Sequence, residues 1–392
     1  MATNNQYINN EVYAIINDVA KMMTGKEDVA VIDTHSFVDF GDSVLSSSDS
    51  TEMFLNAYLL RIAQTYDTFR PYTGQLKDLV LNGSEWGAIV QKIDAEVPDF
   101  VSDDTYELEE GKSIDQYKVR KPTGRQKLFI KRSTYKNYMT TSKKLLKGAF
   151  LSEQAFANWA RMVAGKMRNK IEFALEGLCR LAMANYIANA KDTQFIHLLT
   201  DYNAESGRDL DADEALLDEK FMAYAAGTME LQSKRLRNLS VSYNAEGAER
   251  HTPAGEQRFC VYDLFQSRLQ HVVQFQAYHK DLVSLGEFVE VPYWQGEYET
   301  VEIEGEDVKV PARDKIVVKI EDPEDPTKTV TKTVEKIMGF IFDRYALGAH
   351  RSEEETLTTP INASGRYFNT FHYAEQLWFN DLSENGLVFC LD

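Results

Sequence analysis

The sequence predicts an α+β fold, in which strands stand before and after one unusually long helix. Two observations lead to this prediction. Apolar residues recur at helical spacing over 152–190 with no proline to interrupt them, and alternation of apolar and polar residues marks strands on both sides of that stretch. The strict strand–helix alternation that is typical of nucleotide-binding folds is missing, so a segregated α+β arrangement is favoured.

The composition is that of a chain with an ordinary core and a strong acidic excess. Its 392 residues are 43% hydrophobic and include 61 acidic and 43 basic side chains, for a formal net charge of −18. This length suggests two or three domains, and the charge argues against a broad nucleic-acid-binding surface. Residues 1–25 lack a signal or transit-peptide pattern, and no run of about 18 apolar residues occurs. We therefore expect a cytoplasmic protein.

The three cysteines suggest neither disulfides nor a zinc site. Cys179, Cys260 and Cys390 are odd in number, lie far apart and form no CxxC pair. They are expected to be small buried apolar side chains.

The first 70 residues predict a light arm. Residues 5–23 and 51–66 have the spacing of two short amphipathic helices, the second ending before Pro71. They carry too little apolar material for a core of their own.

Residues 94–126 predict a hairpin that projects from the body. Apolar and polar residues alternate over 84–93 and again over 127–141, as in strands, whereas the segment between is long and mostly polar. Acids gather in its first half and bases in its second, so a like subunit could hold it by charge complementarity. A surface loop without a partner fits the composition equally well. The candidate subunit-interface residues are Glu107, Glu109, Glu110, Lys118, Arg120, Lys121 and Arg125.

The long helix is expected to start at the N-cap Ser152 and to extend for roughly 55 to 60 Å. A helix of that length exceeds the width of an ordinary domain and needs a surface to lie along. The apolar row comprises Phe156, Trp159, Val163, Met167, Ile171, Ala174, Leu178, Leu181, Tyr186 and Ile187.

The remainder of the chain mixes helices and strands. Asp211 and Glu214 form a capping-box pattern that opens a helix over 212–236. The later elements expected are a strand through Phe259, Val261 and Leu264, a helix over 266–284, a strand over 288–292, two β-ribbons over 300–336, and a strand-rich tail over 338–392 with turns at Gly348, 362–365 and 385–386.

No pattern of catalysis or of ligand binding stands out. The glycine loops GxGxxG and GxxxxGK[ST] are missing, as are the GxSxG and HExxH motifs. Residues 201–214 resemble a calcium loop, but Ser206 replaces the turn glycine and Ala212 the final glutamate. His271 and His279 are too far apart on a helix to share a metal without other ligands. We expect no catalytic residue, no cofactor and no metal; these patterns leave an enzyme open, but none of them calls for one.

Three motifs near the C-terminus carry a resemblance to a known family. GFIFDRYALG at 339–348, TTPINASGRYFN at 358–369 and FNDLSENG at 379–386 resemble the closing strands of major capsid proteins of tailed double-stranded DNA bacteriophages. EWGAIV at 85–90 and the stretch 126–171 are similar to the same group. The resemblance implies the Hong Kong 97-like fold, with its N-terminal arm, extended E-loop hairpin, peripheral domain and axial domain.

The order of elements in that family implies a domain map. It assigns an N-terminal arm to 1–75, the E-loop and first peripheral-domain strands to 76–148, the spine helix of the peripheral domain to 149–194, the axial domain to 195–337 with a β-ribbon at 300–336, and return strands of the peripheral domain to 338–392.

The resemblance also implies a function. Such a protein assembles with copies of itself into hexamers and pentamers that form an icosahedral head in the bacterial host cytoplasm. The head encloses double-stranded DNA without sequence-specific binding and involves no membrane; a portal and a separate scaffolding protein are the expected partners. No long charged scaffold segment precedes the arm, so an uncleaved subunit is expected. An encapsulin-like shell protein is the nearest alternative, and an acidic α+β enzyme is a more distant one.

Overall fold

The computed structural model describes residues 16–17, 40–41, 44, 72, 74–82, 90–96, 110–111, 113, 117, 119–130, 133–144, 165–274, 288–296, 298–303, 306–322 and 328–392. Apart from Ile16 and Asn17, both helical, the two helices predicted in the arm lie outside these residues. The strand positions predicted over 84–89 and the predicted helix positions 152–164 lie outside them as well.

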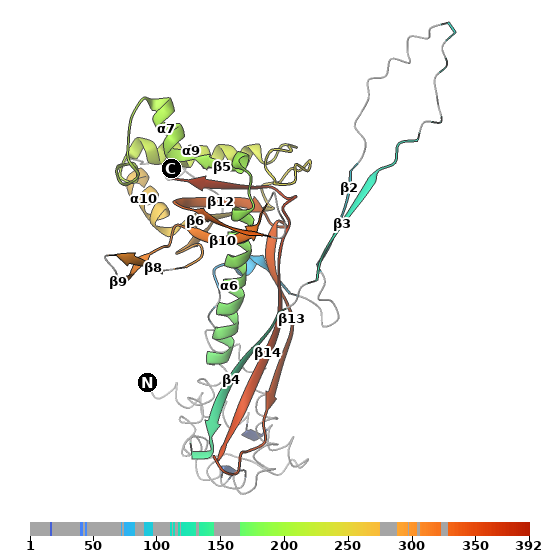
Figure 1. Ribbon diagram of the computed structural model, residues 1–392, viewed down its shortest axis with the longest axis vertical. Helices are drawn as coiled ribbons and strands as arrows, with labels where there is room; N and C mark the ends of the chain where they lie inside the picture. Colours follow the sequence, from blue (N-terminus) through green and yellow to red (C-terminus); the bar gives the residue numbers. More distant parts are fainter. Residues whose placement is uncertain are drawn as a thin grey trace.

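Helix α6 (Lys166–Ala188) confirms the described part of the long helix, and its axis runs along the length of the molecule (Figure 1). No proline interrupts it, and it ends at Ala188 with Asn189 as the C-cap. Two members of the predicted apolar row are corrected. Leu181 is 39% exposed and Ala174 only half-buried, because the helical period turns both away from the face that packs. The buried side chains of α6 include Met167, Ile171, Leu175, Leu178, Ala182, Met183, Tyr186 and Ile187.

A five-stranded sheet forms the centre of the upper body, in the order β5-β15-β12-β6-β7. Its strands are β5 (Phe195–His197), β6 (Gln257–Tyr262), β7 (Phe288–Val291), β12 (Ile337–Asp343) and β15 (Gly386–Cys390). Strand β12 is antiparallel to both its neighbours, whereas the outer strands β5 and β7 are parallel to theirs. Every residue of β12 is buried, so both faces of the sheet are covered.

Alternate residues of the central strands enter two different cores. Phe340 and Val388 pack with α6 on one face, while Ile341 and Phe389 pack with the other helices on the opposite face. Successive side chains of a strand point to opposite faces of the sheet, so neighbouring residues belong to different cores. The result is a three-layer body with α6 on one side.

Four helices of the described residues accompany the second core: α7 (Leu198–Ser206), α8 (Ala212–Ala215), α9 (Glu219–Arg235) and α10 (Asp263–Gln274). The single helix predicted over 212–236 is wrong. Asp211 caps only the short α8 by accepting from the backbone of Asp213 and Glu214, and Asp218 then caps a new helix by accepting from Phe221 N at 2.8 Å. The helix predicted over 266–284 begins earlier, at Asp263, so Leu264 is helical.

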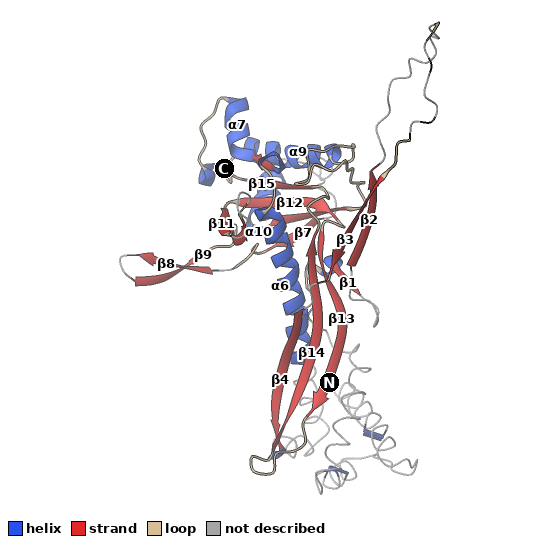
Figure 2. Cartoon of the chain, turned by 45° about the vertical axis from the view of Figure 1, so that its right-hand side comes forward, coloured by secondary structure: helices blue, strands red, loops and turns tan. Residues whose placement is uncertain are grey.

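A four-stranded sheet extends from the body alongside α6, in the order β1-β13-β14-β4 (Figure 2). Its strands are β1 (Val80–Asn82), β4 (Ser133–Ser142), β13 (Leu347–Thr358) and β14 (Tyr367–Asn380), and a 3-10 turn (Lys77–Leu79) precedes β1. The turn predicted at Gly348 is wrong, since Gly348 lies within β13. A Cβ at this position would lie 2.7 Å from the Leu79 carbonyl oxygen, so the close approach of the 3-10 turn before β1 requires glycine.

Three two-stranded ribbons complete the described part: β2 (Val90–Glu96) with β3 (Thr123–Phe129), β8 (Tyr298–Ile303) with β9 (Glu306–Pro311), and β10 (Ile316–Glu321) with β11 (Thr329–Val334). The two ribbons predicted over 300–336 are confirmed. The strand predicted over 127–141 is two strands, β3 and β4, in separate sheets.

The ribbons differ in how they meet the body. β10–β11 packs on α6, whereas β2–β3 and β8–β9 reach outward in different directions (Figure 1). The tail over 338–392 divides between the two large sheets, because β12 and β15 belong to one and β13 and β14 to the other. In the described part, none of the helices combines the length and apolar character needed to cross a bilayer.

Candidate functional site

The projecting β2–β3 hairpin carries apolar side chains that nothing in the described chain covers. The antiparallel register places Ile93 opposite Gln126 and Leu128 opposite Gln91, and these four positions share one face. Ile93 is 77% exposed and Leu128 is 48% exposed. Exposed apolar side chains on such an extension are typical of a surface that another molecule covers. Further exposed apolar residues next to β3 in the sequence are Tyr117, Val119 and Ile130.

The predicted interface residues are only partly described. Glu107, Glu109 and Lys118 lie outside the described residues. Glu110, Arg120 and Lys121 are exposed, as expected of residues that meet a partner. Arg125 is also exposed but stands opposite Asp94 in the register, at the base of the hairpin and not toward its tip. A contact between these residues and a neighbouring subunit remains a prediction.

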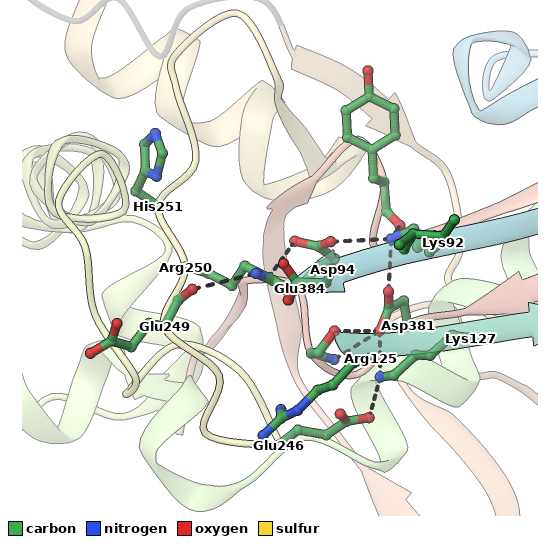
Figure 3. A pocket seen from close by; sticks show the side chains of 13 residues that line it. Lys92, Asp94, Arg125, Lys127, Glu246, Glu249, Arg250, His251, Asp381 and Glu384 are labelled. Atoms are coloured by element: carbon green, nitrogen blue, oxygen red, sulfur yellow. Dashed lines mark hydrogen bonds and ion pairs between the residues drawn. The ribbon is translucent and has the colours of Figure 1, made fainter. Parts of the chain in front are cut away.

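The opposite face of the hairpin is charged and is anchored on the body (Figure 3). Lys92 of β2 donates to Asp381 Oδ2 at 2.8 Å and to Glu384 Oε1 at 3.2 Å, and it also donates to the carbonyl oxygen of Tyr345. The acceptors come from the turn between β14 and β15 and from the turn between β12 and β13. Lys92 therefore ties the first strand of the hairpin to both turns.

Lys127 ties the second strand to the same carboxylate. Its Nζ donates to Asp381 Oδ1 at 2.8 Å and to Glu246 Oε1 at 2.5 Å. Ser383 donates to the same Oδ1 through its backbone N, at 3.1 Å, and through its hydroxyl, at 2.7 Å. Asp381 thus accepts from both strands of the hairpin while its own turn holds it in place.

Arg250 links the first strand of the hairpin to the turn between β14 and β15. It donates to Asp94 Oδ2 of β2 at 2.6 Å, and its Nε lies 3.4 Å from Glu384 Oε2. We call this set the hairpin-base cluster; it consists of Lys92, Asp94, Lys127, Glu246, Arg250, Asp381 and Glu384. It lines a hollow of about 380 Å³, which His251 and Arg125 also border (Figure 3).

Burial and pairing act in opposite directions on the carboxylates of the cluster. The Asp381 side chain is 2% exposed, and burial alone would raise its pKa; hydrogen bonds from Lys127, Lys92 and Ser383 outweigh burial and hold the pKa well below its usual value. For Glu384 burial prevails and raises the pKa, despite the nearby charge of Lys92. The hydrogen bond from Arg250 lowers the pKa of Asp94.

The chemistry of the cluster is that of an anchor. Each of its carboxylates faces a lysine or an arginine, so the charges of the cluster pair with one another across the base of the hairpin. Within the described ranges, no group of three or more His, Cys, Asp or Glu side chains is placed to hold a metal ion. The ion pairs fix the angle at which the hairpin leaves the body.

A second exposed apolar surface lies on the four-stranded sheet. Tyr138 of β4 is 60% exposed and its ring lies 5.6 Å from that of Phe371, with the Tyr373 ring 6.3 Å further along β14. Lys136 stands 5.5 Å above the Phe371 ring. Leu357 of β13 stands opposite Phe371 in the register and is also exposed. This sheet-face patch of Tyr138, Leu357, Phe371 and Tyr373 is a second surface suited to a protein contact.

Comparison with known proteins gives one family and one fold. A sequence model of the Phi29-like phage major capsid protein family matches residues 13–390. No curated protein matches the sequence. Among solved structures, the capsid of Staphylococcus phage Andhra contains a chain with a TM-score of 0.51 and 13% identity, covering 83% of this chain and 86% of that one.

A chain from the structure of the head fiber and inner core protein gp22 of native bacteriophage P68 has a TM-score of 0.55 and 12% identity, covering 82% of this chain and 86% of that one. At these identities the similarity concerns the fold alone. The predicted α+β class of Hong Kong 97-like type is confirmed.

Proposed function

The chain belongs to the Phi29-like phage major capsid protein family, and on that premise we propose how its copies build a shell. It is a structural major capsid protein of a phage. The observation that carries this conclusion is the match of the family over nearly the whole chain, residues 13–390. We propose that the subunits form hexamers and pentamers and that these close into an icosahedral head around the phage genome.

The β2–β3 hairpin is proposed to be the E-loop that lies over a neighbouring subunit. Its apolar face is exposed at Ile93 and Leu128, while its charged face is already satisfied by its own body. The sheet-face patch around Tyr138 offers an apolar surface that a second copy can cover. The proposed interface residues are Glu107, Glu109, Glu110, Lys118, Arg120 and Lys121 toward the hairpin tip, together with Arg125, which stands opposite Asp94 at the base of the hairpin.

The domain map is proposed with one refinement. Helix α6 acts as the spine and the four-stranded sheet beside it as the peripheral domain, with the N-terminal arm at 1–75. The five-stranded sheet with α7 to α10 acts as the axial domain. On this division β12 and β15, which lie within 338–392, join the axial body because they form its central strands.

The family and the fold are those of structural capsid proteins, and we propose that the chain catalyses no reaction. The hairpin-base cluster then serves as an anchor. A portal and a scaffolding protein are the proposed partners, and the enclosed double-stranded DNA is held without sequence-specific contacts. The acidic net charge of −18 supports this last point, because a negative wall does not bind DNA tightly. Assembly is proposed to take place in the bacterial host cytoplasm.

The encapsulin-like alternative has no comparable support, because the family that matches is one of phage capsid proteins. The two hypotheses predict different contents of the shell: a phage head holds DNA, whereas an encapsulin-like shell holds cargo enzymes. Nucleic acid in shells recovered from infected cells would decide for the first.

Velocity sedimentation and negative-stain microscopy of the expressed chain, alone and with the scaffolding protein, test the proposal. We expect capsomers or closed shells in at least one of these conditions. A compact monomer or dimer in both, at concentrations where related shells form, would overturn it.

A further inference from the structure

The β8–β9 ribbon extends away from the upper body on the side opposite the β2–β3 hairpin (Figures 1 and 2). Its strands are paired in antiparallel register from Tyr298 opposite Pro311 to Ile303 opposite Glu306. Among the described strands they pair only with each other. A two-stranded ribbon by itself is marginally stable in water, so this one gains from a surface to lie on.

The register gives the ribbon two different faces, because residues two apart in a strand share a face. On one face, apolar positions occupy the centre and one acid stands at each end; the positions are Glu299, Val301, Ile303, Glu306, Val308 and Val310. The other face is mostly polar in sequence, with positions Tyr298, Thr300, Glu302, Asp307, Lys309 and Pro311, and Tyr298 is 54% exposed. The ribbon is therefore amphipathic and acidic.

A groove with the complementary character lies beside the last turn of α9. It has a volume of about 830 Å³ and runs past the start of β6 and β7. Its floor is apolar, from Phe259, Phe288, Val289 and Ile341, and two arginines, Arg237 and Arg258, line it. Asp78 also lines the groove, 3.9 Å from Arg258.

The basic side chains beside the groove are only partly neutralised by the described part of the chain. Lys234 is paired with Glu230 at 2.6 Å. Arg235 and Arg237 are exposed and form no ion pair with any described residue. Arg237 lines the groove, and no carboxylate of the described residues pairs with it, so it marks a place where an acidic surface can bind.

We propose that the β8–β9 ribbon of one subunit lies in the α9 groove of the next, with its apolar positions over Phe259 and Phe288 and its acids near Arg237. The partner is a second copy of this chain, because the ribbon and the last turn of α9 lie on opposite sides of the five-stranded sheet in both views (Figures 1 and 2). Such a contact is head-to-tail and can close a ring of subunits. The inference rests on the proposed shell function and names one of its contacts.

A face-specific charge reversal tests the contact. Glu299→Lys with Glu306→Lys changes the face that meets the groove, and Glu302→Lys with Asp307→Lys makes the same change in charge on the opposite face. We expect the first pair to lower the yield of shells on the order of tenfold and the matched control to leave it within about twofold. Equal effects of the two pairs, or no effect of either, would overturn the proposal.

The reciprocal variant tests the other side of the contact. Arg237→Glu alone is expected to lower the shell yield, and its combination with Glu299→Lys and Glu306→Lys to restore part of it. The thermal midpoint of the unassembled subunit, measured by circular dichroism, should be unchanged, so that lost assembly is not confused with misfolding. A combination that assembles no better than either parent contradicts the pairing.

Cysteine cross-linking identifies the occupant of the groove. The three native cysteines are buried, so Val308→Cys with Arg237→Cys introduces the reactive thiols. Mild oxidation of shells should give a ladder of multimers on a non-reducing gel. A cross-link within one subunit, or a ladder only when Glu302→Cys replaces Val308→Cys, would refute the assignment. If the wild type assembles and the Glu299→Lys, Glu306→Lys variant gives the same shell yield, only this contact is rejected. If the wild type itself never forms shells, the proposed function is rejected as well.

Discussion

Lys127 of β3 and Asp381, the residue after β14, form an ion pair of 2.8 Å across 254 positions of the chain. Lys92 of β2 binds the other oxygen of the same carboxylate at 2.8 Å. One buried carboxylate thus restrains both strands of a hairpin that otherwise extends away from the body.

Replacing Asp381 with asparagine should destabilise the subunit by about 1 to 3 kcal/mol, because Lys92 and Lys127 lose a buried charged acceptor. Chemical denaturation of the unassembled subunit measures the change. Glu246→Gln is the matched control, since it removes the exposed partner of the same lysine and should cost less than about 1 kcal/mol. Equal losses in the two variants would show that burial of Asp381 contributes nothing.

The contribution of Asp381 should disappear in acid. Its pKa in the folded chain is lower than its usual value of 3.8, so the unfolded chain binds the proton first as the pH falls. The stabilisation is complete above that value and is lost as the pH drops below it toward the folded-state pKa. The difference in unfolding free energy between wild type and Asp381→Asn should therefore be constant near neutral pH and shrink below about pH 4. A difference that grows on acidification would contradict the assigned direction.

A buried ion pair on α6 predicts a non-additive double mutant. Arg180 donates to Glu176 Oε1 at 2.6 Å, Tyr72 donates to the other oxygen at 2.7 Å, and both charged side chains are buried. Glu176→Leu alone leaves a buried guanidinium without its partner and should cost about 3 to 5 kcal/mol. Glu176→Leu with Arg180→Met should cost less than that single change. Simple addition of the two losses in a double-mutant cycle would argue against coupling.

Charge reversal toward the tip of the β2–β3 hairpin tests the proposed interface. Arg120 and Lys121 are exposed, so Arg120→Glu with Lys121→Glu should leave the folded subunit intact while impairing shell assembly. Particle yield by sedimentation and the thermal midpoint of the subunit are the two readouts. Normal particle yield from this variant would remove these residues from the interface.

The apolar face of the hairpin can be tested separately from its charges. Ile93→Ser with Leu128→Ser should reduce assembly, because both side chains are expected to be covered only in the shell. The free energy of unfolding of the isolated subunit should change by less than about 0.5 kcal/mol, as for surface substitutions. A large loss of subunit stability would mean that the subunit itself covers this face.

Local periodicity predicted the elements but not the contacts between distant ones. Alternation around Lys92 and Lys127 indicated two strands, and the antiparallel register of β2 and β3 agrees with it. Their shared partner Asp381 lies in the segment FNDLSENG, which has the composition of an ordinary turn. A single sequence holds no signal that links a lysine to one of 61 acids so far along the chain. The hairpin-base cluster therefore escaped sequence reasoning.

Two sequence predictions are wrong because one residue type can have two structural roles. The prediction that Asp211 caps a helix is confirmed, but Asp218 is a second cap seven residues later, and the apolar pattern continues across the break between α8 and α9. The sequence predicts a turn at Gly348, whereas this glycine is required because the Leu79 carbonyl oxygen lies too close for a Cβ. Composition alone does not separate a capping aspartate from a solvated one, or a turn glycine from a packing glycine.

The anchoring of the β2–β3 hairpin by Lys92, Lys127 and Arg250 affects how quickly and how tightly subunits can join. A hairpin that moved freely relative to the body would lose its orientational freedom on binding a neighbouring subunit, and that entropic cost would weaken each contact. In the proposed shell, folding of the monomer would already have oriented the β2–β3 hairpin, so most of the entropic penalty would precede the encounter. Each added subunit would then bind the edge of the shell with the reach and direction of its hairpin already set.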